Sequence, residues 1–290
     1  MAEIGLVQFS GVALELARAT VPAYRSKYSK HTFTQAQVLV ILCLMRYDDW
    51  TFREAEVRLA EHRELRAALG LQKVPDYSTL NRFLQRLEDK LIDQVLAEVV
   101  RRLNTALAPP GSSTTVAVDA TGLAPGAVST FFVHRVRERD GFTWRHRLKW
   151  TLVVDVPRRT VIAQTARQGP YNDGATWRPL KRAASGRTSI RLILADAESA
   201  SERNHQFVRQ ELHARSVIPA KRGKPGWQIS GVRAKMRQSF PRKLYAQRSL
   251  IESVISATKR KLSSRAPGRS LETQRKQALL LGLAYDLYRL

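Results

Sequence analysis

The chain has 290 residues and a net charge of +24 at pH 7, from 49 lysines and arginines against 25 acidic residues. This excess predicts a polyanionic partner, and nucleic acid is the first candidate. The longest apolar runs, 38–45 and 278–284, fall short of the ~20 residues that span a bilayer, so no membrane partner is expected. The single cysteine, Cys43, excludes intrachain disulfides and multi-cysteine zinc sites.

The beginning of the sequence indicates where the protein works. The first residues show no basic leader followed by an apolar stretch and a cleavage site. We therefore expect a cytoplasmic protein, associated with the nucleoid through its basic charge. No G-x-x-x-x-G-K-[ST] loop is found, so no nucleotide cofactor is expected.

The first hundred residues are predicted to be helical. Apolar residues recur at intervals of three and four over 35–46, 51–62 and 91–103. A further helix is predicted over 80–87, after a proline turn and capping residues, with Asn81 and Arg82 on its polar side. Such side chains read bases in the major groove when a helix-turn-helix protein binds DNA, but any solvated helix face shows similar residues. Both interpretations stay open.

The prolines, glycine and serines of residues 108–113 break every periodicity and predict a domain boundary. We therefore expect an all-α, DNA-binding domain over residues 1–110. A second domain, over residues 111–290, is predicted to be α/β.

Short β-branched runs follow the boundary, which predicts a mixed five-stranded sheet with flanking helices. The second and third predicted strands are joined by a tight turn and form a hairpin. The predicted strands cover 114–118, 148–156, 160–165, 191–195 and 216–220. Helices are predicted over 202–213 and 244–261.

Two predicted strands end in an aspartate, Asp119 and Asp196. Open α/β sheets place function at the ends of their strands, so these carboxylates can converge there. If the helix that carries Glu252 packs on the same sheet, three carboxylates meet at one edge. Such a set suits Mg²⁺, and two ions can support an in-line displacement at phosphorus. The alternative is that each aspartate only makes a turn, which is common at strand ends.

Tyr245, Arg248, Glu252 and Lys259 follow the spacing Y-x2-R-x3-E-x6-K. On a continuous α-helix these offsets bring all four side chains onto one stripe. There, Glu252 could hold a metal ion while Arg248 and Lys259 bind phosphate oxygens. The alternative is an ordinary surface face with an i,i+4 ion pair. Residues 221–280 contain sixteen lysines and arginines but only two acids. Arg260 and Lys261, which follow Lys259 directly, are also expected to bind DNA.

In this order, the Asp119 block, the Asp196 block and the Y-x2-R-x3-E-x6-K series resemble a bacterial insertion-sequence transposase of the DDE class. The resemblance covers residues 114–265 and implies an RNase H-like core. It implies that Asp119, Asp196 and Glu252 are the catalytic triad and bind two Mg²⁺ ions, for which Mn²⁺ can substitute. It further implies that Arg248 and Lys259 contact phosphates of double-stranded DNA and that Tyr245 positions the strand.

Relatives cleave and join DNA as dimers or larger complexes, so oligomerisation on DNA is also implied. Only 55 residues separate Asp196 from Glu252, which is typical of the compact members. Trp227 could stack on a flipped base, as an aromatic residue does in certain relatives, or pack on the sheet. Two alternatives remain: a metal-dependent nuclease that never joins strands, and a transposase-derived protein that only binds DNA.

Overall fold

The computed structural model describes residues 4–107, 109, 111–125, 148–169, 174–221 and 230–290. Its first part is helical, as predicted. The helices are α1 (Leu6–Thr20), α2 (Gln35–Tyr47), α3 (Phe52–Glu61), α4 (Arg63–Ala68), α5 (Tyr77–Arg86) and α6 (Asp89–Leu107). Thr34 and Thr51 each close a capping box, which fixes where α2 and α3 begin. α1 and α4 were not expected from the sequence pattern.

The second part contains a five-stranded sheet in the order β3-β2-β1-β4-β5. The strands are β1 (Thr114–Leu123), β2 (Leu148–Asp155), β3 (Thr160–Gln168), β4 (Ile190–Leu194) and β5 (Arg215–Val217). β1, β2 and β3 pair antiparallel, whereas β4 and β5 lie parallel to β1. The mixed sheet and its hairpin are confirmed, and the arrangement is that of an RNase H-like fold.

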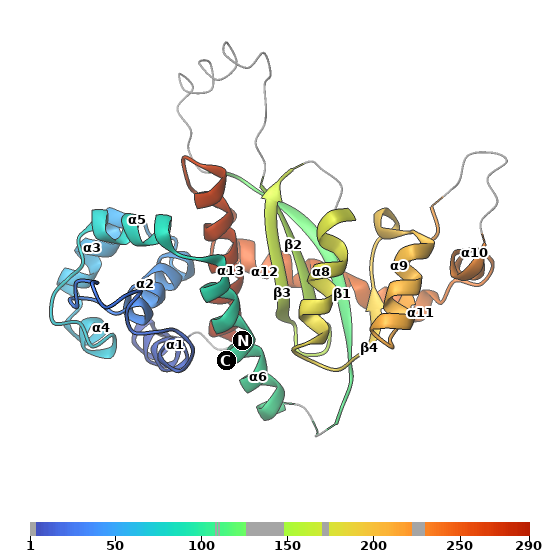
Figure 1. The fold of residues 1–290 in the computed structure, drawn as a ribbon, viewed down its shortest axis with the longest axis horizontal. Helices are drawn as coiled ribbons and strands as arrows, with labels where there is room; N and C mark the ends of the chain where they lie inside the picture. The colour runs from blue at the N-terminus through green and yellow to red at the C-terminus, as the bar shows by residue number, and fades with distance from the viewer. Residues whose placement is uncertain (1–3, 108, 110, 126–147, 170–173, 222–229) are drawn as a thin grey trace, which may run out of the picture.

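Helices cover this sheet and extend beyond it (Figure 1). They are α8 (Gly174–Ser185), α9 (Glu202–Gln206), α10 (Gly231–Gln238), α11 (Arg242–Tyr245), α12 (Ser249–Lys261) and α13 (Leu271–Arg289). The predicted helix over 202–213 is α9 followed by a π-helical turn, Phe207–Glu211. The predicted last strand is shorter and earlier than expected, since β5 ends at Val217.

Two expectations about the site-bearing elements were wrong in detail. β1 does not end at Asp119, because its ladder with β2 continues to the pair Leu123 and Leu148. The predicted continuous helix over 244–261 is divided into α11, a 3₁₀ turn at Ala246–Arg248, and α12. Tyr245 and Arg248 therefore precede the α-helix that carries Glu252 and Lys259.

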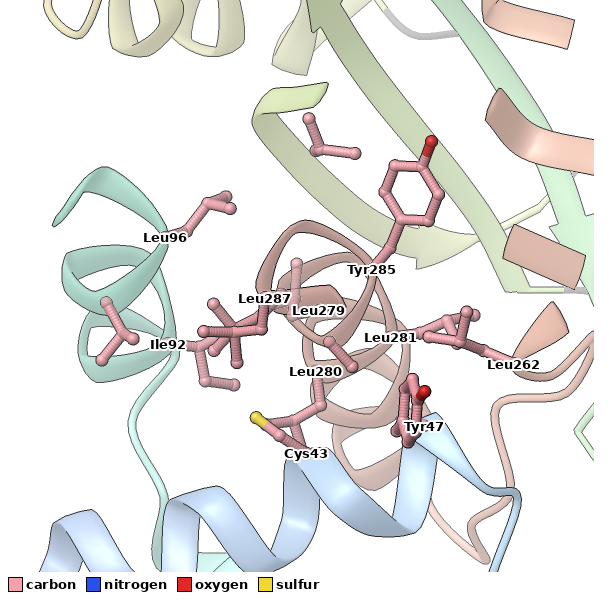
Figure 2. Packing of buried hydrophobic residues seen from close by; sticks show 14 of the residues in the cluster. Cys43, Tyr47, Ile92, Leu96, Leu262, Leu279, Leu280, Leu281, Tyr285 and Leu287 are labelled. Atoms are coloured by element: carbon pink, nitrogen blue, oxygen red, sulfur yellow. The ribbon is translucent and has the colours of Figure 1, made fainter. Parts of the chain in front are cut away.

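The last helix, α13, joins the two parts of the molecule. It lies between the N-terminal helices and the sheet (Figure 1) and packs against α2, α6 and β3. Figure 2 shows leucines of α13 beside Cys43 of α2 and Ile92 of α6. One apolar core thus extends from the helical part to one face of the sheet. The boundary near residue 110 stays a prediction.

The apolar run at 278–284 lies inside α13 and is buried there. Among the described residues, no helix is long and apolar enough to cross a membrane.

Candidate active site

Asp119 and Asp196 lie on neighbouring parallel strands or directly after them. Ala117 of β1 pairs with Leu194 of β4, and the aspartates stand two residues further along each chain. Asp119 is half-buried within β1, and its side chain accepts a hydrogen bond from the Ala120 amide at 2.9 Å. Asp196 caps a short 3₁₀ helix and accepts from the amide of Ser199 at 3.3 Å. The sheet therefore holds both carboxylates near the C-terminal end of β4. We call this place, together with the facing residues of α12, the carboxylate edge.

Arg248 connects this edge to α12. Its Nη2 lies 3.0 Å from Oδ2 of Asp119, and its Nη1 donates to Oε1 of Glu252 at 3.2 Å. Only 16% of the Arg248 side chain is exposed, against 62% for Glu252. One guanidinium therefore bridges two of the three predicted metal ligands, and the 3₁₀ turn before α12 places it there.

The electrostatic setting of Asp119 reflects this arrangement. Burial raises its pKa, and the Arg248 guanidinium and the Ala120 amide oppose that rise. The negative charges of Asp196 and Glu252 raise the pKa further. Asp196 and Glu252 thus each lie near enough to Asp119 to influence its pKa. Burial also raises the pKa of Tyr245, which feels the same charged groups.

Lys259 lies further along α12 and contacts the extension of β1 that the sequence analysis did not predict. Its Nζ donates to Thr121 Oγ1 at 2.6 Å and to the Gly122 carbonyl at 2.9 Å. Since Arg248 meets β1 at Asp119 and Lys259 meets it at Gly122, α12 runs along β1 in the same direction. This register brings the residues of the sequence motif to one edge of the sheet.

Asp119, Glu252 and Lys259 border an open hollow of about 450 Å³. Its lining comes from the second half of β1 and from α12: Asp119, Ala120, Thr121, Glu252, Ile255, Ser256, Lys259 and Arg260. Carboxylates and cations therefore face the same space. Lys261, which was predicted to bind DNA, points elsewhere, because its Nζ lies 5.7 Å from the centre of the Tyr288 ring on α13.

The donor set fits a divalent cation in kind, because carboxylate oxygens are the ligands that Mg²⁺ prefers. In the described part of the chain, however, no three His, Cys, Asp or Glu side chains are grouped so that they could hold a metal ion. Arg248 instead pairs with both Asp119 and Glu252. To share a cation with Asp196, these two carboxylates have to exchange the guanidinium for the ion.

The remaining predicted site residues lie apart from this edge. Asn81 and Arg82 are on α5 in the helical part, where Asp76 caps the helix by accepting from the Thr79 amide. Arg82 is exposed, and its Nη2 donates to Ser78 Oγ at 2.6 Å. Trp227 lies outside the described residues.

Sequence reasoning missed Thr121 and Gly122, the partners of Lys259. The signal was weak, because β1 was expected to end at Asp119. The strand continues over residues 120–123, where apolar and polar side chains do not alternate clearly. This stretch also contains Gly122, and glycine is depleted in strands.

The sheet order, with acids on β1, after β4 and on α12, defines an RNase H-like α/β domain with an acidic edge. The chain belongs to the family described as the transposase DDE domain, which matches residues 110–287. It is therefore a protein of the transposase class, whose substrate is DNA. No curated protein matches the chain.

Proposed function

We propose that this protein binds the ends of a DNA element, cleaves them with the help of divalent cations and joins the freed ends to a second phosphodiester. The observation that supports the proposal is that Arg248 bridges Asp119 and Glu252 beside the strand that leads to Asp196. Lys259 contacts β1 nearby. The family match gives this edge its chemical context. Cleavage followed by strand transfer is the cut-and-paste form of transposition.

Asp119, Asp196 and Glu252 would hold the ions. Two Mg²⁺ ions, or Mn²⁺ in their place, would activate a water or a 3′-hydroxyl and stabilise the leaving oxygen when bound there. The half-buried Asp119 needs a counter-charge, because burial raises its pKa. Arg248 supplies that charge in this structure, and it would be able to pair with a phosphate if a cation took its place.

Other residues at the edge would hold the DNA strand. Lys259 and Arg260 border the hollow and carry the charge that a phosphate needs. Tyr245 packs edge to face against Phe240, with ring centres 5.0 Å apart, so its ring has a fixed position for the strand to contact. On α5, Asn81 and Arg82 would contact the element end. We expect a dimer or a larger complex on DNA, because two ends have to be joined.

One observation favours a second candidate, a transposase-derived protein that only binds DNA. In the described residues the three carboxylates are not grouped as a metal site, and Arg248 pairs with two of them. A nuclease that cleaves without joining strands would share the whole site and differs only in its products.

Cleavage and strand transfer on labelled DNA that carries the element's ends, in Mg²⁺ or EDTA, separate these candidates. The native chain should cut and join in Mg²⁺ only. Glu252→Gln should retain DNA binding and lose cutting, because the amide keeps the size of the side chain without its charge. Cutting without joined products would indicate a nuclease. Tight binding without cutting in Mg²⁺ or Mn²⁺ would indicate the binding-only protein.

A further inference from the structure

Residues 22–34, which join α1 to α2, form a closed loop that we call the basic loop. Gln35, the first residue of α2, fixes the base: its amide donates to the Ala23 carbonyl at 2.8 Å and its Nε2 to the Pro22 carbonyl at 3.0 Å. Phe33, near the C-terminal end of the loop, packs against the core. Compact loops with fixed ends of this kind frequently carry function.

The basic loop is braced across its middle and turned at its tip. The rings of Tyr24 and His31 stack with their centres 4.2 Å apart and their planes 15° from parallel. At the tip, the Ser29 amide donates to the Ser26 carbonyl at 3.1 Å, which closes a four-residue turn. Lys27 and Tyr28 are the two central residues of that turn, so the structure projects them from the surface.

Tyr28 is the most exposed of the large hydrophobic side chains described, with 84% of its surface accessible. The Lys27 ammonium lies 5.1 Å from the centre of the Tyr28 ring. Arg25 and Lys30 are also exposed, and the sequence contains no acid between Glu15 and Asp48. An aromatic ring held in solvent among cations is the combination with which proteins bind unpaired nucleic acid, through phosphates and stacked bases.

The basic loop continues the surface of α5. Arg25 lines a cleft of about 480 Å³ together with Gln85 and Arg86, which end α5. Two of the acids in that cleft are already paired. Asp89 lies 2.8 Å from Arg275, and Glu272 lies 2.6 Å from Lys276. Arg25 and Arg86 form no ion pair with any described residue, so their charge is left for a ligand.

We propose that the basic loop is a DNA contact for an unpaired segment of the substrate, distinct from the carboxylate edge. Arg25, Lys27 and Lys30 bind phosphates, and the open face of Tyr28 stacks on an unpaired base. This inference rests on the proposed function, in which the chain acts on DNA. It assigns the loop a preference for single-stranded or distorted DNA over a regular duplex.

The first test measures binding of the full chain to a labelled duplex and to the same duplex with one unpaired 2-aminopurine. Tyr28→Ala should weaken binding to the second DNA by roughly 5- to 150-fold, the value of one base–aromatic stack of ~1–3 kcal/mol. Binding to the regular duplex should change little. Tyr28→Phe should behave like the native chain. The native chain should also quench 2-aminopurine fluorescence, and Tyr28→Ala should not.

The second test removes charge from the basic loop. Since each phosphate contact to a single strand contributes a slope of about −0.7, the triple variant Arg25→Ala, Lys27→Ala and Lys30→Ala should flatten the dependence of log K on log salt by about 2. The matched control removes three exposed charges elsewhere in the helical part, with Arg63→Ala, Lys73→Ala and Lys90→Ala. It should leave the preference for unpaired DNA intact.

The outcomes separate this inference from the function beneath it. A native chain that binds neither DNA overturns both. A native chain that binds DNA, with Tyr28→Ala equally good on both DNAs or equally weakened on both, overturns the basic loop as a contact for unpaired DNA and leaves the proposed function standing. Thermal unfolding should be the same for the native chain and for the variants with altered Tyr28, because that side chain is exposed.

Discussion

The carboxylate edge and the basic loop use charge in opposite ways. At the edge, residues far apart in sequence meet, and their charges are compensated inside the protein: Arg248 pairs with Asp119 and with Glu252. In the basic loop, the charges come from one short segment and stay in solvent. The contrast suits the two proposals: exposed charges in the loop would attract a polyanion, whereas the edge would have to exchange Arg248 for a cation before it could cleave DNA.

The largest effect is expected at the edge. Asp119→Asn should lower cleavage by roughly 100-fold or more, because losing a group that merely supports a metal ligand already costs about 10- to 100-fold. The variant keeps the shape of the side chain but removes the charge that Arg248 and a cation both need. Single-turnover cleavage in saturating Mg²⁺ measures it.

Asp93→Asn is the matched control, since Asp93 is an exposed carboxylate on α6 that pairs with Arg187. It should retain nearly native cleavage. Equal losses of cleavage in the two variants would show that Asp119 acts only through general charge or stability. The carboxylate edge would then have no role that an exposed surface carboxylate lacks.

A second prediction concerns α13, which packs against both the N-terminal helices and the sheet. A Cβ at Gly282 would stand 2.1 Å from Gln164 Oε1 and 3.0 Å from Trp150 Cζ2. Gln164 cannot move freely, because it accepts from Trp150 Nε1 at 3.0 Å and donates to the Leu279 carbonyl at 2.8 Å. Gly282→Ala should therefore lower the free energy of unfolding by about 1–3 kcal/mol, the usual cost of overpacking. Urea unfolding measures the change.

Because one core extends from the helical part to the sheet, Gly282→Ala should shift the unfolding signals of the helices and of the sheet together. Separate transitions would break the picture of a shared core and support the predicted boundary near residue 110 as an independent folding boundary.

A third prediction separates the roles of burial and Arg248 at the edge. Arg248→Met should raise the pKa of Asp119 further, since the guanidinium now opposes the rise that burial causes. The sign follows because removing a cation favours the neutral carboxyl. An NMR titration of the Asp119 carboxyl carbon measures the pKa. An unchanged or lowered value would show that Arg248 does not hold Asp119 in solution.

The smallest effect is expected in α1. Gly11 lies within α1, and a Cβ there would meet nothing within 4 Å. Gly11→Ala should raise the free energy of unfolding by up to about 1 kcal/mol, because alanine loses less backbone entropy in a helix. It also serves as the control for Gly282→Ala, and a loss of stability would show that the surface of α1 is packed against something.

Local pattern was enough to predict much of this molecule. The hairpin of β2 and β3 follows from its β-branched runs, and Asp155 closes the turn by accepting from the Arg158 amide at 3.0 Å. The approach of Asp119 and Asp196 followed from two buried strands that each lead to an aspartate. The basic loop was not singled out, because its exposure and its braced shape arise only on folding.

Long-range contacts explain what local pattern could not predict. The apolar run in α13 shows no polar face, because α13 is buried between the helices and the sheet, and its periodicity gave no signal. The 3₁₀ turn before α12 contains no glycine or proline. Its position coincides with the reach of Arg248 to Asp119, a contact across more than a hundred residues of sequence that no local rule contains.

The most direct test of the account is a crystal structure of the protein with an element end and Mn²⁺, with the ions located by anomalous scattering. The strongest peaks are expected between Asp119, Asp196 and Glu252, with Arg248 withdrawn from Asp119 and paired with a DNA phosphate. Bound DNA without a peak at this edge, and with Arg248 still bridging Asp119 and Glu252, would contradict it and identify a protein that only binds DNA.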